Sequence, residues 1–264
     1  MATTEPGDGR RRILRTAGAL AVSDARGVGR DPLLRWLIGY PIALALLLRW
    51  GVPALAGPVE ARFGIALLDY GVLVTSAMVE LLPVLVGMVV GFLLLDERDD
   101  RTLAALQVTP LGLNGYLAYR VALPMVVSVV MTVIAVPLVG LARTDLGPLL
   151  VIALGAAPLA PLFALFLAAF AGNKVEGFAL TKASGMLFVP PVIAYFVAPP
   201  WQWLFGVVPT YGPLKAFWTQ QGVGWAAGPS PGAGGYIVPL AIGLVLQVAL
   251  LRWLLRRVRR SVVM

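Results

Sequence analysis

The sequence predicts an all-α integral membrane protein with six transmembrane helices. Three observations support this fold class: only 13% of residues are charged, 59% are hydrophobic with a mean hydropathy of +0.87, and six long apolar segments recur along the chain. A soluble domain carries roughly 25% charged residues, so this chain has too little charge to cover a surface that faces water. We therefore expect lipid to surround most of it.

The six apolar segments are long enough, or nearly so, to cross a bilayer, whose ~30 Å core needs about 20 helical residues. Prolines at positions 148, 158 and 161 predict kinks in the fourth. The acid and proline of Asp31-Pro32 favour a helix start before the first. In chain order, the predicted spans cover Leu33–Leu55, Gly71–Leu95, Val121–Leu141, Pro148–Ala171, Ala183–Ala198 and Tyr236–Trp253.

We interpret residues 1–264 as one transmembrane domain, with the six-helix part at 33–253. Residues 1–9 read as a disordered tail, and 254–264 as a basic cytoplasmic tail. Residues 10–30 combine a run of arginines with one apolar face, which predicts an amphipathic helix in the membrane interface. A solvated charged tail is the alternative for this stretch.

Lys and Arg residues orient the spans, because they concentrate on the cytoplasmic side of membrane proteins. With the N-terminus inside and six spans, all but four of the 21 Lys and Arg residues fall on the cytoplasmic side. The four exceptions are Arg49, Arg62, Arg143 and Lys215. The pattern predicts cytoplasmic N- and C-termini.

The segment before the last span is aromatic and apolar but broken by proline and glycine. Residues 201–217 are too short for a span, and we expect one or two short re-entrant helices in the outer leaflet. Trp201, Trp203, Phe205, Tyr211 and Trp218 supply either an outer gate or ordinary interfacial anchors. An exposed loop is predicted at Gly222–Gly235.

The chain contains no cysteine and no histidine. Disulfides, thiolate or imidazole metal sites and Cys or His catalysis are therefore excluded, and neither a catalytic residue nor a metal ligand is predicted. The net charge of +8 comes from bases at the ends of apolar runs and in the terminal segments. This pattern favours contact with lipid headgroups, so we expect membrane lipids and not nucleic acid as partners.

Two charged residues stand inside predicted spans, Arg49 and Glu80. At ~1.5 Å per residue they lie at similar depths in the outer half of the membrane. Intramembrane charges are costly and often functional, so the pair could form an ion pair across spans one and two or line a polar translocation cavity. Alternatively, Arg49 reaches the outer headgroups and Glu80 meets water near the surface.

Residues 96–111 follow span two with acids first and then apolar residues. Acids suit a helix N-terminus, and Thr109-Pro110 ends the helix. Such a short amphipathic cytoplasmic helix could dock into a groove on a soluble partner. A hydrophilic loop is the alternative.

This segment resembles a motif of the permeases of the ABC type-2 exporter family, Glu-Arg-Glu-x-Gly-Thr-Leu followed by Thr-Pro or Ser-Pro. Arg101 departs from the family glycine, which makes helix formation easier, since Gly lowers helix stability. The entry to span one at 30–34, the basic N-terminal helix and the re-entrant region are also similar. The matching motif residues are Glu97, Arg98, Asp99, Thr102, Leu103, Thr109 and Pro110.

A narrower resemblance is to drug-export permeases of the fluoroquinolone-export type. It rests on Asn173–Leu180 with Lys182 close behind, and on Pro209-Thr210-Tyr211. The resemblance implies a permease of the bacterial cytoplasmic membrane that exports a drug-like, lipid or other amphiphilic cargo. It implies pairing with a second copy or a sister permease.

The resemblance also implies that a cytoplasmic ATP-binding cassette subunit drives transport. This chain has no G-x-x-x-x-G-K-[ST] phosphate loop, so ATP and magnesium would belong to that partner, and this chain would hold no cofactor and would not be an enzyme. A second contact would come from the loop at 172–182. The residues implied in ATPase coupling are Glu97, Arg98, Asp99, Thr102, Leu103, Leu106, Asn173, Lys174 and Glu176.

A secondary transporter or channel driven by an ion gradient is the main alternative. Such proteins use buried acids, often in repeated halves, whereas Glu80 is the only acid well inside a predicted span and no repeat is visible. An intramembrane protease is disfavoured because the catalytic groups are missing. A purely structural membrane subunit is the third interpretation.

Overall fold

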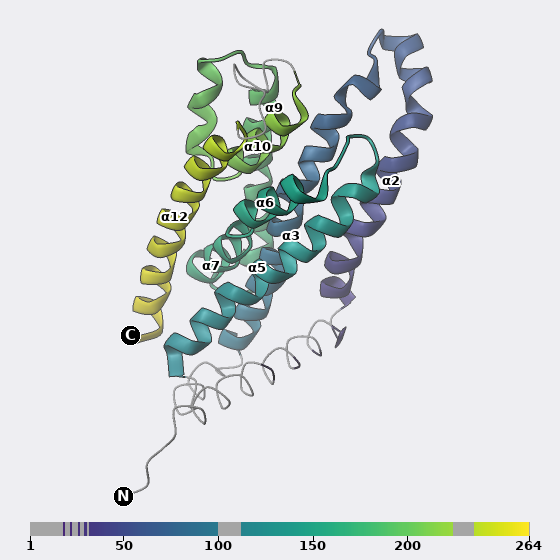
Figure 1. The fold of residues 1–264 in the computed structure, drawn as a ribbon. Coiled ribbons are helices and arrows are strands. Elements are labelled where there is room, and N and C mark those ends of the chain that lie inside the picture. The colour runs from purple at the N-terminus through teal and green to yellow at the C-terminus, as the bar shows by residue number, and fades with distance from the viewer. Residues whose placement is uncertain are drawn as a thin grey trace, which may run out of the picture.

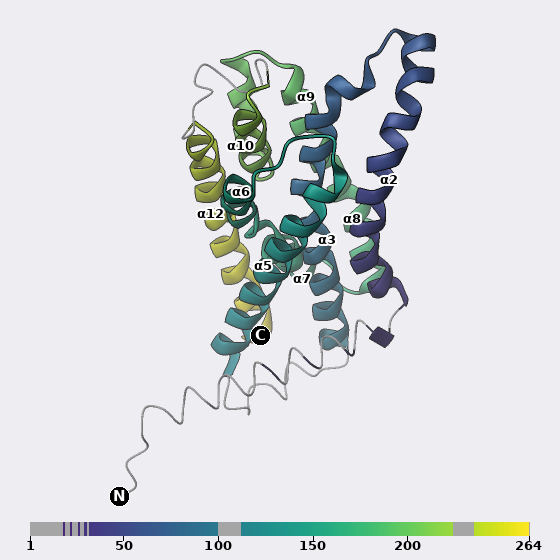
Figure 2. The same cartoon turned by 45° about the vertical axis from the view of Figure 1, so that its right-hand side comes forward.

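The computed structural model describes residues 32–99, 112–223 and 235–263, and five single residues further towards the N-terminus (18, 22, 26, 29 and 30). Figures 1 and 2 show helices joined by short connections, and no strand occurs in these ranges. The elements are α2 (Pro32–Phe63), η1 (Leu67–Tyr70), α3 (Gly71–Asp99), α5 (Gly112–Val139), α6 (Leu146–Ala156), α7 (Leu159–Phe170), α8 (Lys174–Ser184), η2 (Gly185–Phe188), α9 (Val189–Phe196), η3 (Trp201–Val207), α10 (Tyr211–Gln221) and α12 (Ile237–Val263).

Six segments of the described chain are long and apolar enough to cross a membrane, which confirms the predicted fold class. The ends of α3 and α12 and the starts of α5 and α8 lie at one end of the bundle, which we call the Glu97 end (Figure 1). The opposite end, the Arg143 end, holds the α5–α6 connection. The segments are Gly39–Phe63, Leu67–Arg98, Gly115–Val139, Leu146–Phe170, Lys174–Phe196 and Ile237–Arg259.

Several helices continue beyond the predicted ends of their spans. The first helix runs through Arg49 to Phe63, and the second runs through Glu97 to Asp99. The fifth span begins at Lys174, in what we expected to be a loop, and the last continues through the basic tail to Val263. The length of an apolar segment indicates how much of a helix lies in lipid, but it does not fix where the helix ends. A helix satisfies its own backbone hydrogen bonds, so it can continue into water.

The fourth span is broken, as its prolines predict. It consists of α6 and α7, which meet at Ala157-Pro158, and Pro158 occupies the N-cap position of α7. Pro161 lies in the first turn of α7 without interrupting it, because a first-turn N–H has no intrahelical partner to lose.

The central helix of the bundle is α3, which is almost entirely buried, whereas α2 exposes most of its surface to the surroundings. Gly87 and Gly91 form a G-x-x-x-G pair on α3 where α7 crosses it. A Cβ atom built on Gly87 would lie 2.3 Å from the carbonyl oxygen of Ala160, and one on Gly91 would lie 2.7 Å from Leu167 Cδ1. Small residues therefore allow the two backbones to approach closely, as in many membrane helix pairs.

The region before the last span forms two short helices, η3 and α10, as predicted (Figure 2). The start of α10 packs against α12 so tightly that a Cβ atom on Gly212 would lie 2.6 Å from the Cα of Gly243. At its other end, the Gln221 side chain donates to the backbone oxygen of Arg143. Helix α10 therefore begins inside the bundle and runs towards the Arg143 end.

Three predicted segments fall largely outside the described residues. These are the tail at 1–9, the interfacial helix at 10–30 and the loop at 222–235. Within the second, the five described residues, Gly18, Val22, Arg26, Gly29 and Arg30, are helical and exposed.

Candidate functional site

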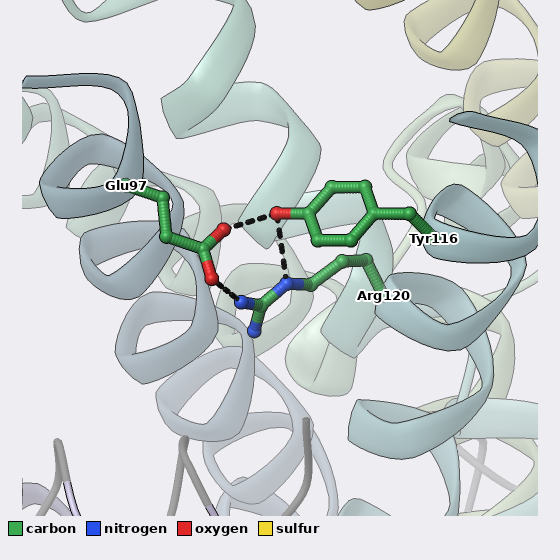
Figure 3. Close-up of polar contacts among 3 residues, drawn as sticks. All are labelled: Glu97, Tyr116 and Arg120. Carbon is green, nitrogen blue, oxygen red and sulfur yellow. Dashed lines mark hydrogen bonds and ion pairs between the residues drawn. The ribbon is translucent and has the colours of Figure 1, made fainter. Parts of the chain in front are cut away.

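A carboxylate, a phenol and a guanidinium meet at the Glu97 end of the bundle (Figure 3). Glu97 lies in the last turns of α3, and its two oxygens accept from the Tyr116 hydroxyl and from Arg120 Nη2. Arg120 Nε also lies 3.1 Å from the Tyr116 oxygen, so each group contacts the other two. The guanidinium lies 5.3 Å from the Tyr116 ring centroid as well. This triad joins α3 to α5.

The triad is largely buried, so its charges must be compensated within the protein. The Arg120 side chain is fully buried, and Tyr116 is 2% exposed, whereas Glu97 keeps about a quarter of its side chain exposed. A buried guanidinium is costly unless a carboxylate and hydrogen bonds compensate it. Glu97 therefore determines whether the Arg120 charge can remain between the helices.

Asp96, the residue before Glu97, contacts a different helix. Its carboxylate lies 3.0 Å from Lys174 Nζ at the start of α8, and both side chains are about one third exposed. Partly exposed ion pairs of this kind contribute little stability. The contact therefore sets the position of α8 relative to α3 more than it strengthens the fold.

Arg98, the residue after Glu97, contacts the end of α7. Its Nη2 donates to the Gly172 carbonyl at 2.6 Å, and its Nη1 donates to the Ala168 carbonyl at 3.5 Å. The last carbonyls of a helix lack intrahelical donors and carry the negative end of the helix dipole. A guanidinium fits both requirements.

The start of α8 is closed by its own cap. The Asn173 side chain accepts from the Glu176 backbone N–H at 3.0 Å, and Glu176 accepts from the Gly172 N–H at 2.6 Å. The capping residue thus satisfies a free N–H group of the first turn, and the acid three positions later satisfies the N–H of the residue before the cap. Asn173, Lys174 and Glu176 thus form a helix start and not the loop we expected.

Three consecutive residues therefore connect α3 to three other elements. Asp96 contacts α8, Glu97 contacts α5, and Arg98 contacts the end of α7. We call these three residues and their contacts the α3 junction. Any force that displaces the end of α3 acts on all three neighbours.

The sequence placed Glu97 and Arg98 in a coupling segment but expected them to begin a new helix. The structure corrects this, because they continue α3. The Asp99 side chain and Thr102, Leu103 and Leu106 lie outside the described residues. Tyr116 and Arg120 were missed. Their spacing of four residues places them on one helix face, a signal that could have found the pair but not its acidic partner.

The two intramembrane charges do not pair in this structure. Arg49 Nη1 donates to the Leu138 carbonyl at 3.3 Å, near the end of α5, and the residue is exposed. Glu80 is 1% exposed, so it does not meet water at the surface either. Helix α2 sets Arg49 against α5, whereas Glu80 on α3 faces the interior.

The aromatic group divides into an outer and an inner set. Trp201 and Trp203 are exposed, consistent with interfacial anchors. Tyr211 and Trp218 are buried, and the Trp218 indole donates to Ser76 Oγ at 2.8 Å. Phe205 is half-buried against the same core. The expectation that Trp218 anchors the chain at the interface was therefore wrong, because α10 turns its ring inward.

Lys215 is a buried cation of the same helix, and sequence analysis placed it among the external charges. It is 2% exposed and donates to the Gln202 side chain, whose amide donates to the Ala194 carbonyl at 2.8 Å. Burial lowers the pKa of Lys215 to about 8. In the described ranges, no cluster of three or more carboxylates could hold a metal ion.

Comparison with known proteins places these features in a family. Residues 24–255 match the family described as "Fluoroquinolones export permease protein Rv2686c-like". Two curated relatives, the fluoroquinolones export permease proteins MT2760 and Rv2686c of Mycobacterium tuberculosis strains CDC 1551 and H37Rv, are each 34% identical over 237 residues. Each match covers 88% of this chain and 92% of the relative. No solved structure matches. The chain, a multi-pass helical membrane protein, therefore belongs to the Rv2686c-like family of fluoroquinolone-export permeases.

Proposed function

We propose that this chain is the membrane-spanning permease subunit of an ATP-driven exporter. It moves drug-like amphiphilic molecules, including fluoroquinolones, out of the cytoplasm. A separate ATP-binding cassette subunit binds the Glu97 end, which faces the cytoplasm together with both termini. Two permease subunits pair in the bacterial plasma membrane, as two copies or as a copy with a sister permease.

The α3 junction is the observation that supports this proposal. An exporter without its own ATPase needs an element that contacts the partner at one end and transmits the partner's conformational change to the spans. Asp96, Glu97 and Arg98 connect α3 to α5, α7 and α8 at that end. The close packing of α3 on α7 at Gly87 and Gly91 extends the connection into the membrane, since closely packed helices move together.

Within this mechanism, Glu97 is a positioning residue. Its carboxylate is occupied by Tyr116 and Arg120, so it fixes α5 against α3. The more exposed groups beside it, Arg98 and Lys174, face the partner subunit. ATP binding in the partner moves this end, and the spans open the path for the cargo. ATP and magnesium stay in the partner.

The test compares two arginines at opposite ends of the bundle. The permease is produced with its ATP-binding cassette subunit in proteoliposomes, and fluoroquinolone-stimulated ATP hydrolysis and export are measured. We expect Arg98→Gln to lower both several-fold, with normal insertion. The matched control is Arg143→Gln, since Arg143 forms an exposed ion pair with Asp145 at the other end, and it should behave as the wild type.

Two results would contradict the proposal. One is an Arg98→Gln variant whose stimulated hydrolysis and export equal those of the wild type and the Arg143→Gln control. The other is uphill export by the purified chain alone on an ion gradient. The second result would favour a secondary transporter, the alternative for which the buried Glu80 is the supporting feature.

A further inference from the structure

Unpartnered polar atoms concentrate around the start of α10. Five buried side-chain oxygen atoms in the described residues have no hydrogen-bond partner, and only Thr181 Oγ1 lies elsewhere, on α8. Native structures leave few such atoms, because each costs the energy of a lost hydrogen bond. The concentration therefore indicates a missing partner. The other four atoms are Glu80 Oε1, Thr210 Oγ1, Tyr211 Oη and Gln247 Oε1.

Contacts between the elements bring three of these side chains to one place. The Gln247 amide nitrogen donates to the Pro209 carbonyl at 2.9 Å, directly before Thr210. The Thr210 hydroxyl lies close enough to interact with the Glu80 carboxyl, although the two groups do not meet in hydrogen-bond geometry. The Tyr211 ring instead packs edge-on near Trp203 and Trp218, with centroids 6.3 and 6.4 Å away, so it belongs to the aromatic group.

Helix faces agree with this placement. Ser76 and Glu80 are four residues apart on α3 and share a face, and Ser76 accepts from Trp218 of α10. Gly243 and Gln247 are likewise four apart on α12, and Gly243 touches Gly212 of α10. The start of α10 is therefore enclosed by the Glu80 face of α3 and the Gln247 face of α12.

The chemistry of the three groups defines the partner. The carboxylate and amide oxygens only accept hydrogen bonds, and the Thr210 hydroxyl oxygen can also accept. Glu80 takes part in no ion pair with a described residue. It lies nine residues beyond Gly71, about 14 Å along the helix axis, at a depth where a charge is costly without an opposite charge.

We propose that Glu80, Thr210 and Gln247 form a site for one monovalent cationic group held by oxygen atoms. An alkali ion or the ammonium group of a cationic cargo meets this description, because carboxylates bind both directly. When occupied, the site joins α3, α10 and α12, three elements that the α3 junction does not connect to one another. The site is independent of the energy source of transport.

The experiment uses the full-length permease alone in lipid nanodiscs, without ATPase, ATP or cargo. Thermal unfolding is followed in sodium, potassium, choline and ethylammonium chloride at constant ionic strength. We expect a saturable rise in Tm with sodium, potassium or ethylammonium but not with bulky choline, because binding to the native state stabilises it. A response to sodium or potassium assigns an inorganic ion, and a response to ethylammonium alone assigns a cargo amine.

Variants locate the site. Glu80→Gln should raise the half-saturating concentration roughly tenfold or abolish the response, since charged contacts are the strongest, and Thr210→Val and Gln247→Leu should raise it several-fold. Thr181→Val is the matched control, because it removes the one unpartnered buried oxygen outside the cluster, and its response should equal that of the wild type.

Equal stability of the wild type in all four salts would overturn the proposal and would mean that water or a proton alone satisfies the cluster. A wild-type response that Glu80→Gln leaves unchanged would also overturn it. If Glu80→Gln fails to fold, the wild-type salt series and the Gln247→Leu variant still decide. Since no step uses ATP or measures export, failure here leaves the proposed function untouched.

Discussion

Glu97 and Arg120 form an ion pair between α3 and α5 in which the guanidinium is fully buried and the carboxylate remains partly exposed. This asymmetry makes the arginine dependent on the acid. The pair also receives the Tyr116 hydroxyl, so that three side chains from two helices form one polar unit inside an apolar cluster that includes Leu95 and Leu117. Its strength can be tested by removing its members singly and together.

We expect Glu97→Gln to destabilise the permease by about 3 kcal/mol or more, because it leaves a buried guanidinium without its counter-charge. The double variant Glu97→Gln with Arg120→Met should recover much of this loss, because the buried guanidinium that lost its Glu97 partner is gone. Tyr116→Phe removes two hydrogen bonds, one to Glu97 and one from Arg120, and should cost about 2 kcal/mol. Thermal or denaturant unfolding in detergent measures all three. A double variant as unstable as the sum of Glu97→Gln and Arg120→Met, each measured singly, would show that the pair is not coupled.

Gly87 should not tolerate a side chain. We expect Gly87→Ala to destabilise the protein by about 1–3 kcal/mol, because the new methyl group would collide with the Ala160 carbonyl and push α7 away from α3. Gly57→Ala is the control, since Gly57 lies within α2 with nothing within 4 Å of an added Cβ. It should be neutral or slightly stabilising, because alanine favours helix. Equal loss in both variants would contradict the close α3–α7 contact.

The free energy of unfolding should rise with pH above about 8, because Lys215 loses its proton in the folded protein before it does so in the unfolded chain. Its pKa is lowered by burial to about 8, whereas a lysine in an unfolded chain titrates near 10.4. Between these values the unfolded chain binds more protons than the native state, so the penalty of the buried charge is full below about pH 8 and disappears as pH approaches 10.4.

The measurement for Lys215 is the difference in Tm between the wild type and Lys215→Met from pH 7 to pH 10. The variant lacks the titrating group, so the difference should shift in favour of the wild type as pH rises. Subtracting the variant cancels the titration of other groups. A difference that stays constant, or moves the other way, would show that Lys215 remains fully charged in the folded protein.

The start of α8 should depend on its cap. We expect Asn173→Ala to destabilise local structure by about 1 kcal/mol, because the side chain accepts from the Glu176 N–H at 3.0 Å. Hydrogen exchange of the first turn of α8 in nanodiscs measures the effect, and it should increase there while the amides of α3 remain protected. Val175→Ala, an exposed change in the same turn, serves as the control. Unchanged hydrogen exchange in Asn173→Ala would show that the Asn173 side chain does not stabilise the first turn of α8.

The sequence by itself determined that this is a helical membrane protein with six spans, a broken fourth span and short helices before the last one. The reason is physical: lipid cannot satisfy backbone hydrogen bonds, so long apolar segments must be helical, and prolines interrupt them at positions that the sequence shows directly. The resemblance of residues 96–111 to the exporter-permease motif also singled out Glu97 and Arg98.

The tertiary structure decided which side chains meet and which are buried. Residue type alone favours a position at the membrane surface for Trp218, Lys215 and Arg120, but all three are buried in the structure. Their environments depend on the rotation and depth of each helix in the bundle, which follow from close packing between helices far apart in the chain. The same holds for Arg49 and Glu80, which the sequence predicted at similar depths but which face different neighbours, because α2 and α3 turn them in different directions.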